Sequence, residues 1–417
     1  MKISAYLQKV KSYCNVLSTV LIGKTRLSIS QPAPCEVLII DSAAELELVP
    51  ALLSNYRWLA LDYRFSNYGG VLYIHPKIVI RTLAYLLHGY PPLASYMLAV
   101  ISVTKPKVVI DFCNLDYMVV LASVFTDITF LSIINGMFNY PFNHELYKPM
   151  LHQILGEKKL RGNGNYGVYC FGQRDVDIFG YFGVSESNMG IRVQPVGPLL
   201  GSYYIDKIEP ADCSPQIEFD ICLISQSGVG HVTIDNPFNQ ALMKCNDLLC
   251  EFLVKFINTH GLRLVIAPRT REKGRDVEIE YNYFRKWFGG DVIIPHREDL
   301  MSTYRVMRRS RINISLCSTC GWEALLWKQK AMFCPFYLSE IFGEYAPGKL
   351  NSNQEMWEWW LEEANYEKFE IMLLELFNLT EDQYWDRAQH KAEYAMNYGA
   401  SLATHILGED IKSVIGR

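Results

Sequence analysis

The chain has no excess of charge of either sign. Its 417 residues include 40 basic and 44 acidic side chains, which gives a formal net charge of −4. Proteins that bind nucleic acid through its phosphates usually carry a clear basic excess, so the chain as a whole has no such electrostatic footprint. Half of the residues are apolar and a fifth are charged, which excludes a disordered or fibrous chain. Internal repeats and low-complexity tracts are absent as well.

The cysteines do not have the pattern of a disulfide-bonded protein. There are eleven, an odd number, spread from Cys14 to Cys334. Disulfide frameworks use even numbers of cysteines in short chains, so we expect free thiols in a reducing compartment, the cytoplasm. Cys317 and Cys320 form a single C-x-x-C pair without a second pair or a histidine at ligand spacing, which is weak evidence for zinc. We predict no metal and no cofactor.

A convincing export signal and a membrane span are also missing. Residues 82–104 carry no Asp, Glu, Lys or Arg, but the prolines at 91–92 divide them into two short pieces that fit two buried helices. No acidic residue precedes Glu36, and apolar residues recur at helical spacing over residues 3–21. A basic amphipathic helix within residues 1–34 fits either docking on the protein body or contact with the inner face of the cytoplasmic membrane.

The length fits two to three domains at about 150 residues each. Apolar runs alternate with helical patterns in two stretches, separated by a segment rich in proline and glycine at 197–215. Strands are expected at 36–41, 58–61, 107–112, 128–134, 166–171 and 192–195, and then at 219–224, 262–267, 292–294, 312–316 and 331–334. Alternation of this kind predicts parallel sheets covered by helices on both faces.

The predicted fold class is therefore α/β, with two doubly wound Rossmann-type domains that face a cleft and helices at the C-terminus. The expected parts are an N-terminal basic helix at 1–35, a first domain at 36–200, a linker at 201–218, a second domain at 219–350 and C-terminal helices packing across the domains at 351–417. Ligands bind where the carboxyl ends of such strands meet. Periplasmic-type binding proteins, nucleotide-sugar epimerases and GT-B glycosyltransferases share this plan.

Three loops that follow strands of the second domain are candidates for chemistry. In the first, SQSGVGHVTID at 225–235, glycines allow close approach to a ligand and Asp235 precedes a predicted helix. This carboxylate is either aimed at a reacting sugar carbon or an ordinary acid at a helix N-terminus. In the second, APRTREK at 267–273, the cations fit either a bound phosphate or carboxylate or a solvated charge run.

The third loop, SLCSTCGWEA at 315–324, takes a buried strand into a helix through small hydroxyl residues. Ser318 and Thr319 are candidates for binding phosphate, and Glu323 for meeting a sugar hydroxyl. The alternative is an ordinary Ser/Thr helix cap. Elsewhere, Asp175 and Asp177 form a D-x-D, but an acidic first turn of a helix explains this motif better than a metal site.

Several segments, taken in order, resemble bacterial surface-carbohydrate biosynthesis proteins of GT-B type. They are EVLIID, KPKVVIDF, FLSIINGMF, YCFGQRDVDIFGYFG, PVGPLL, LISQ and SLCSTCGWEALLWKQKAMF, within residues 36–336. The chain looks most like the retaining β-Kdo transferases of O-antigen and capsule synthesis. This resemblance implies a CMP-Kdo donor, a glycan or lipid-linked glycan acceptor, an acceptor domain at 36–200 and a nucleotide-sugar domain at 219–350.

The resemblance also implies roles for single residues. Asp235 matches the carboxylate thought to attack C2 of Kdo, giving a covalent adduct that the acceptor resolves. The expected acceptor side includes Asn135, Gly136 and the segment 137–165. Apart from the resemblance, Glu157 in that segment is expected to assist as acid or base, so the expected catalytic residues are Asp235 and Glu157. The expected donor-binding residues are Gln226, Ser227, His231, Pro268, Arg269, Arg271, Lys273, Ser318, Thr319, Gly321 and Glu323. Where many relatives have His-Pro before a basic residue, this chain has Ala267-Pro268.

Two other interpretations fit the same residues. One is a GT-B transferase that uses a UDP- or GDP-sugar. The other is a non-catalytic protein that binds a sugar or a nucleotide on the same two-domain scaffold.

Overall fold

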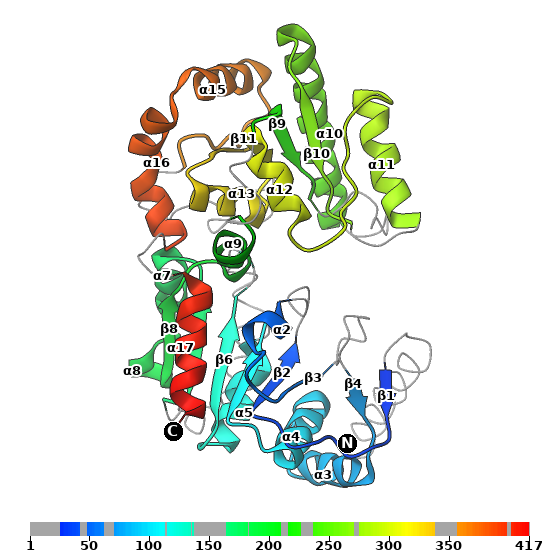
Figure 1. The fold of residues 1–417 in the computed structure, drawn as a ribbon, viewed down its shortest axis with the longest axis vertical. Helices are drawn as coiled ribbons and strands as arrows, with labels where there is room; N and C mark the ends of the chain where they lie inside the picture. The colour runs from blue at the N-terminus through cyan, green and yellow to red at the C-terminus, as the bar shows by residue number, and fades with distance from the viewer. Residues whose placement is uncertain are drawn as a thin grey trace.

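The computed structural model describes most of the chain. The described residues are 26–41, 48–61, 71–112, 115–134, 136, 164–181, 183–209, 216–226, 237–270, 275–337, 357–397 and 402–416. They form an N-terminal and a C-terminal lobe, each built around a parallel sheet (Figure 1). Within these residues no helix is both long and apolar enough to cross a bilayer.

The N-terminal lobe is built on a six-stranded parallel sheet with the order β3-β2-β5-β6-β7-β8. The strands are β2 (Val37–Asp41), β3 (Trp58–Ala60), β5 (Val108–Asp111), β6 (Thr129–Ile133), β7 (Tyr166–Cys170) and β8 (Ile191–Pro195). Every residue of β5 and β7 is buried. A strand covered on both faces needs mostly apolar residues, which is why these strands read as apolar runs, apart from buried Asp111 at the end of β5.

Helices and a small second sheet complete this lobe. The helices are α2 (Val49–Leu52), α3 (Pro76–Leu87), α4 (Pro92–Thr104), α5 (Leu115–Val124), α7 (Gln173–Tyr181) and α8 (Glu186–Met189). Strands β1 (Arg26–Ser28) and β4 (Val71–Tyr73) pair in parallel. Residues 26–28, at the end of the segment expected to hold a basic helix, are thus a strand, and the expected helical positions 3–21 lie outside the described residues.

The C-terminal lobe has a four-stranded parallel sheet with the order β10-β9-β11-β12. The strands are β9 (Phe219–Ile224), β10 (Leu264–Ala267), β11 (Ser310–Ser315) and β12 (Lys330–Phe333). The helices are α10 (Pro237–His260), α11 (Arg275–Phe288), α12 (Ser302–Arg308), α13 (Thr319–Glu323) and the 3-10 turn η3 (Ala324–Trp327). In Figure 1 the strands of the two sheets point toward each other, so both carboxyl edges face the opposite lobe.

Two predicted elements of this lobe differ from the structure. The strand expected at 292–294 is wrong, because only Ile293 bridges to Val265 and its side chain faces solvent at the sheet edge. The pattern of residues 299–308 predicts a helix, which in the structure begins at Ser302. It begins later because the side chain of Asp299 accepts the backbone N–H of Met301, at 2.9 Å, and so ends the preceding loop.

The connection between the lobes begins as a helix. Helix α9 (Leu199–Tyr203) and the π-helical turn η2 (Tyr204–Ile208) occupy the first half of the segment expected to be a linker. Gly201 does not break this helix. A Cβ atom there would lie 2.5 Å from Cδ1 of Leu326, so the glycine lets α9 lie directly against η3 of the other lobe.

The C-terminal helices run from the C-terminal lobe back to the N-terminal lobe (Figure 1). They are α15 (Tyr366–Asn378), α16 (Glu381–Ala395) and α17 (Ala403–Ile415). Buried Lys330 in β12 donates to the carbonyl of Leu376 at the end of α15, over 2.7 Å. At the other end, Lys107 beside β5 donates to the carbonyl of Ile415, also over 2.7 Å.

Candidate functional site

The three loops singled out in the sequence leave the same edge of the C-terminal sheet. They follow β9, β10 and β11, which lie side by side with β9 in the middle. Because the strands are parallel, the beginnings of the three loops are neighbours. Two side chains link these loops to one another.

The first of these side chains is Glu280, a fully buried residue of α11. Its carboxylate accepts the hydroxyl of Ser225, which follows β9. It also accepts the backbone N–H groups of Arg269 and Thr270, which follow β10, each over 2.9 Å. The loops after β9 and β10 are therefore held to one carboxylate by three hydrogen bonds.

The sequence prediction did not include Glu280. A signal was present, because Phe284 lies one helical turn further along α11 and is also buried. A glutamate on the apolar face of an amphipathic helix is unusual unless hydrogen-bond donors meet it. Those donors lie 10 to 55 residues away in sequence, so the pattern alone does not identify them.

The second linking side chain is Gln226. Its Oε1 atom accepts the backbone N–H of Cys317 over 2.9 Å, and its Nε2 atom lies 3.1 Å from the sulfur of the same residue. The amide thus ties the loop after β9 to the loop after β11. Burial raises the pKa of the Cys317 thiol to about 12, so the sulfur is a neutral hydrogen-bond partner near neutral pH.

The C-x-x-C pair has no metal-binding partners within the described part of the chain. Burial also raises the pKa of the Cys320 thiol to about 12, and both cysteines are free. The described residues contain no group of three or more His, Cys, Asp or Glu side chains that could hold a metal ion.

The loop after β11 is shaped by its own small residues. The hydroxyl of Ser315 accepts the backbone N–H of Ser318 over 3.2 Å, and α13 begins at the next residue, Thr319. A Cβ atom on Gly321 would lie 2.8 Å from the ring of Phe333 and 2.9 Å from the hydroxyl of Ser315. Gly321 is thus needed for α13 to pack onto the sheet, whatever contact it makes with a donor.

Glu323 faces the protein interior. Only 2% of this residue is exposed, and its carboxylate accepts the hydroxyl of Tyr304 in α12 over 2.7 Å. Burial raises the pKa of Tyr304, and the adjacent negative charge of Glu323 raises it further. The phenol therefore stays protonated as the donor, and the pair fixes α13 against α12.

The loop after β11 comes close to the N-terminal lobe. Gly136 follows β6, and a Cβ atom there would lie 3.4 Å from the hydroxyl oxygen of Thr319. Gly136 was expected on the acceptor side and Thr319 on the donor side. The structure places these two residues next to each other across the lobes.

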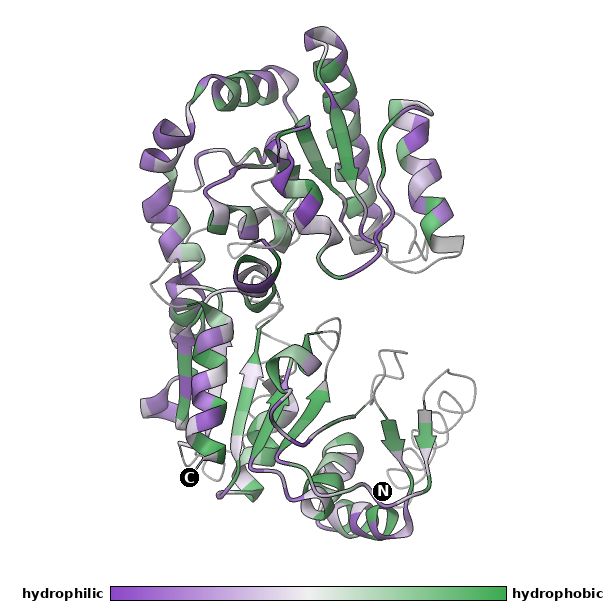
Figure 2. Ribbon diagram, in the orientation of Figure 1, coloured by the Kyte–Doolittle hydropathy of each residue, from purple (hydrophilic) through white to green (hydrophobic). Residues whose placement is uncertain are grey.

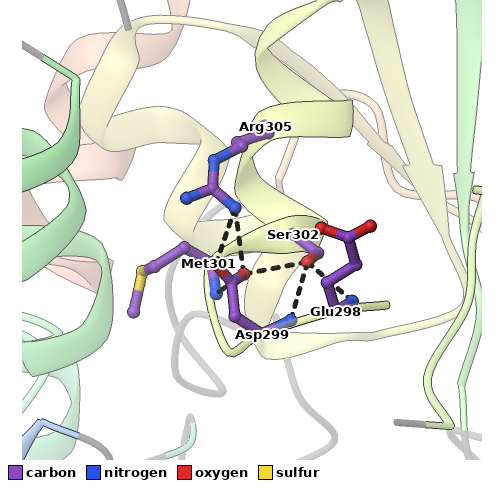
Figure 3. Close-up of polar contacts among 5 residues, drawn as sticks. All are labelled: Glu298, Asp299, Met301, Ser302 and Arg305. Carbon is purple, nitrogen blue, oxygen red and sulfur yellow. Dashed lines mark hydrogen bonds and ion pairs between the residues drawn. The ribbon is translucent and has the colours of Figure 1, made fainter. Parts of the chain in front are cut away.

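One cationic side chain, Arg269, belongs to the loop after β10, and a second, Arg297, contacts this loop from outside. Arg269 is exposed, and the guanidinium of Arg297 donates to its carbonyl over 2.6 Å, which holds the loop from the side of α12. Pro268, before it, is buried. Figure 3 shows the neighbouring cluster, in which Arg305 donates to both carboxylate oxygens of Asp299, over 3.0 and 2.9 Å.

The Asp299 cluster sets the start of α12. Ser302 donates its hydroxyl to Asp299 over 2.8 Å and accepts the backbone N–H of Glu298 over 3.1 Å (Figure 3). Partial burial raises the pKa of Asp299, but the hydrogen bonds from Arg305 and Ser302 outweigh it and leave the pKa below its ordinary value. Asp299 is therefore ionised at neutral pH and partly neutralises Arg305.

The D-x-D residues contact protein groups. Asp175 is fully buried, pairs with Arg174 over 3.1 Å and accepts the backbone N–H of Phe171 over 3.1 Å. Asp177 accepts the hydroxyl of Tyr394 from α16 over 2.7 Å. These carboxylates join α7 to its surroundings.

The remaining predicted site residues lie outside the described residues. They are Asn135, Glu157, Ser227, His231, Asp235, Arg271 and Lys273. Gln226, Pro268, Arg269, Ser318, Thr319, Gly321, Glu323 and Gly136 are described, and their contacts are those given above.

Comparison with known proteins identifies the fold. The chain is similar, with a TM-score of 0.52 and 12% identity over 90% of this chain and 99% of the other, to the Methanocaldococcus jannaschii UDP-GlcNAc 2-epimerase in complex with UDP-GlcNAc and UDP. Structures of S. aureus MnaA with UDP (TM-score 0.52, 11% identity) and of a variant of the wall teichoic acid polymerase TagF (0.52, 10%) are also similar. These cover 91% of this chain and 96% and 89% of theirs. The chain has the GT-B fold.

The sequence comparisons cover less of the chain. Residues 233–406 match a family model described as "putative O-antigen biosynthesis protein". No curated protein matches the sequence. The GT-B fold confirms the predicted fold class, and the family match connects its C-terminal part with O-antigen biosynthesis proteins.

Proposed function

We propose that the protein is a GT-B glycosyltransferase of surface-polysaccharide synthesis that transfers Kdo from CMP-Kdo to a glycan acceptor with retention. The observation that carries the proposal is the closeness of Gly136 to Thr319, whose hydroxyl oxygen would lie 3.4 Å from a Cβ atom built on the glycine. It brings the loop after β6 of one lobe to the loop after β11 of the other, where both sheets present their carboxyl edges. In α/β folds this is where substrates bind.

The linked loops support the binding of an anionic donor. Ser318 and Thr319 offer hydroxyl groups where α13 begins, and exposed Arg269 offers a guanidinium at the end of β10. CMP-Kdo carries one phosphodiester and one carboxylate, which guanidinium and hydroxyl donors suit. The match of residues 233–406 to an O-antigen biosynthesis family supports a surface polysaccharide as the product.

The proposed reaction has two displacements at C2 of Kdo. The Asp235 carboxylate forms a bond to C2 while the bond from C2 to the phosphate oxygen breaks, and CMP leaves with the electron pair. An acceptor hydroxyl oxygen then attacks C2 and displaces Asp235, and Glu157 takes the hydroxyl proton. Two inversions give net retention. Both carboxylates lie outside the described residues, so the role of Asp235 rests on the family resemblance and that of Glu157 on its place in the 137–165 segment beside the expected acceptor side.

Incubation of the purified protein with CMP-Kdo and a glycan acceptor tests the proposal. We expect CMP release and a lengthened acceptor, and we expect Asp235→Ala to abolish both. Full activity of Asp235→Ala would remove the proposed nucleophile. Binding of CMP-Kdo without turnover would instead favour a non-catalytic binding protein.

The nucleotide is tested separately by thermal shift. CMP at a concentration well above its Kd should raise the melting temperature, because a ligand that binds only the folded state stabilises it. Stabilisation by UDP or GDP and not by CMP would show that the donor is a UDP- or GDP-sugar. The proposal that the protein is a transferase would then still stand.

A further inference from the structure

The N-terminal lobe exposes an apolar surface that its core does not use. Seven of the thirteen large apolar side chains that are exposed among the described residues belong to residues 27–87. They are Leu27, Ile29, Ile74, Val79, Ile80, Leu83 and Leu87. We call these seven residues the α3 outer face.

Four of these seven residues, Val79, Ile80, Leu83 and Leu87, belong to helix α3. Ile80, Leu83 and Leu87 follow one another at helical spacing and are 66%, 53% and 80% exposed. The opposite side of α3 buries Ile78 and Thr82. The helix is thus apolar on two sides, and only one of them is required for packing.

Strands β1 and β4 lie beside α3. The backbone N–H of Ile74 donates to the carbonyl of Ser28 over 2.8 Å, which places the residues after β1 beside the residue that leads into α3. Figure 1 shows β1 and β4 next to α3 at the end of the molecule away from the C-terminal lobe. In Figure 2 β4 is mostly green, whereas α16 is mostly purple.

The stretch of chain that contains α3 lacks acidic residues. No acidic residue occurs between Val71 and Ile110, and this stretch contains four cations. Two of them, Lys77 and Arg81, are exposed on α3 one turn apart. An exposed aliphatic stripe flanked by cations on one helix is the pattern of helices that lie on anionic membrane surfaces.

We propose that the α3 outer face docks on an anionic lipid bilayer, with Ile80, Leu83 and Leu87 entering the interface and Lys77 and Arg81 meeting lipid phosphates. All seven exposed residues are aliphatic, whereas protein interfaces are usually anchored by aromatic residues and arginine. The carboxyl edges of both sheets stay away from the lipid in this orientation. The inference does not depend on the proposed transferase reaction.

Co-sedimentation of the full chain with vesicles tests this inference. We compare vesicles of phosphatidylcholine alone with vesicles that also contain phosphatidylglycerol, at low and high salt. We expect binding only to the anionic vesicles, weaker at high salt because the charge attraction is screened. The double variant Leu83→Asp/Leu87→Asp should bind more than about tenfold more weakly. The double variant Lys77→Gln/Arg81→Gln should bind anionic vesicles about fivefold more weakly for each cation removed.

A matched control lies on the other lobe. Ile371 in α15 is 67% exposed but has acidic neighbours at Glu367, Glu370 and Glu375. We therefore expect Ile371→Asp to bind anionic vesicles like the wild type. The substituted side chains are exposed, so all variants should melt close to the wild type. If Leu83→Asp/Leu87→Asp nevertheless unfolds the protein, the weaker vesicle binding expected of Lys77→Gln/Arg81→Gln still tests the inference.

Three results would overturn the inference. One is a wild type that does not bind, or that binds both kinds of vesicle equally. Another is undiminished binding by Leu83→Asp/Leu87→Asp, which would assign the affinity to another part of the chain. The last is a wild-type dimer that the same variant dissociates, which would make this face an interface between two copies. Vesicle binding needs no donor, so failure here is distinct from failure of the proposed function.

Discussion

Glu280 is the residue on which the ends of two neighbouring strands converge. A buried carboxylate is costly unless donors surround it, and here one hydroxyl and two backbone N–H groups do so. The loops after β9 and β10 lead directly into the segments that contain Asp235, Arg271 and Lys273. Glu280 is therefore a positioning residue in our interpretation of the site.

Replacing Glu280 by alanine should destabilise the protein by about 3 kcal/mol, because it leaves buried donors without an acceptor. Urea unfolding measures this change. Exposed Glu278 on the same helix provides the control, and Glu278→Ala should change the free energy of unfolding by less than about 0.5 kcal/mol. Equal stability of the two variants would contradict the role given to Glu280.

Asp299 makes stability depend on pH in a defined direction. Its pKa is below the ordinary value in the folded protein, so its contribution is present above the unfolded pKa of about 3.9 and is lost as the pH falls through the folded pKa. At pH 7 we expect Asp299→Asn to melt at a lower temperature than the wild type. The difference should stay nearly constant from pH 7 to about 5 and narrow as the pH falls below about 4. Exposed Asp291 is the control, and a difference for Asp299→Asn that is independent of pH would contradict the assignment.

At the scale of elements, the short helix α13 depends on close contact with the sheet beneath it. Its glycine lies where a Cβ atom would meet the ring of Phe333 and the hydroxyl of Ser315. The hydroxyl also accepts the backbone N–H of Ser318, so a displaced α13 would disturb the loop that we propose binds the donor. The hydroxyl of Ser315 therefore both packs against α13 and holds the loop of the candidate site.

Gly321→Ala should therefore cost about 1–3 kcal/mol, because the added methyl group overpacks this contact. Thermal and urea unfolding give the value. Gly180 in α7 is the comparison, because a Cβ atom there meets nothing within 4 Å. Gly180→Ala should leave stability unchanged or raise it by up to about 1 kcal/mol. The reverse order of the two variants would contradict the packing described.

Sequence patterns predict the two sheets well for a physical reason. Strands covered on both faces are mostly apolar, so β5, β7 and β9 stand out as apolar runs in which Asp111 and Asp220 are the acidic residues. The segment at 199–208 is helical although the prolines and glycines of residues 197–215 indicate a linker, because Gly201 serves a tertiary contact that no local pattern contains. The predicted strand at 292–294 does not form, because only Ile293 bridges to β10, where its carbonyl accepts the backbone N–H of Ile266.

The candidate site is less accessible to prediction. Ser318 and Gly321 follow from a strand, a loop and a helix read in order. Glu280 and the bond between Gln226 and Cys317 depend on residues 55 and 91 positions apart, which only the fold brings together.

At the scale of the molecule, the two lobes share their cores. One buried cluster contains Val37 and Ile110 of the N-terminal sheet, Leu407 and Ile411 of α17, and Tyr304 of the C-terminal lobe. Tyr304 also stacks on Tyr204 of the connection, with ring centroids 5.5 Å apart. Large apolar contacts between lobes favour unfolding as a single unit.

Calorimetry should accordingly show one cooperative transition for the whole chain. Leu407→Ala removes a buried side chain from the shared cluster and should lower stability by about 2–5 kcal/mol while the transition stays single. Glu409→Ala, on the exposed side of the same helix, should have little effect. Two separate transitions, of which Leu407→Ala shifts only one, would contradict a shared core.

The return of α17 to the first lobe also sets the order of events during translation. The contact between Lys107 and Ile415 joins residues 308 positions apart. A nascent chain that has released its first 200 residues from the ribosome still lacks the helix that covers that part of the protein. At about 5–20 residues per second, the helix follows on the order of ten seconds later or more. Termination of synthesis before α17 therefore leaves the first half of the protein without the helix that covers it.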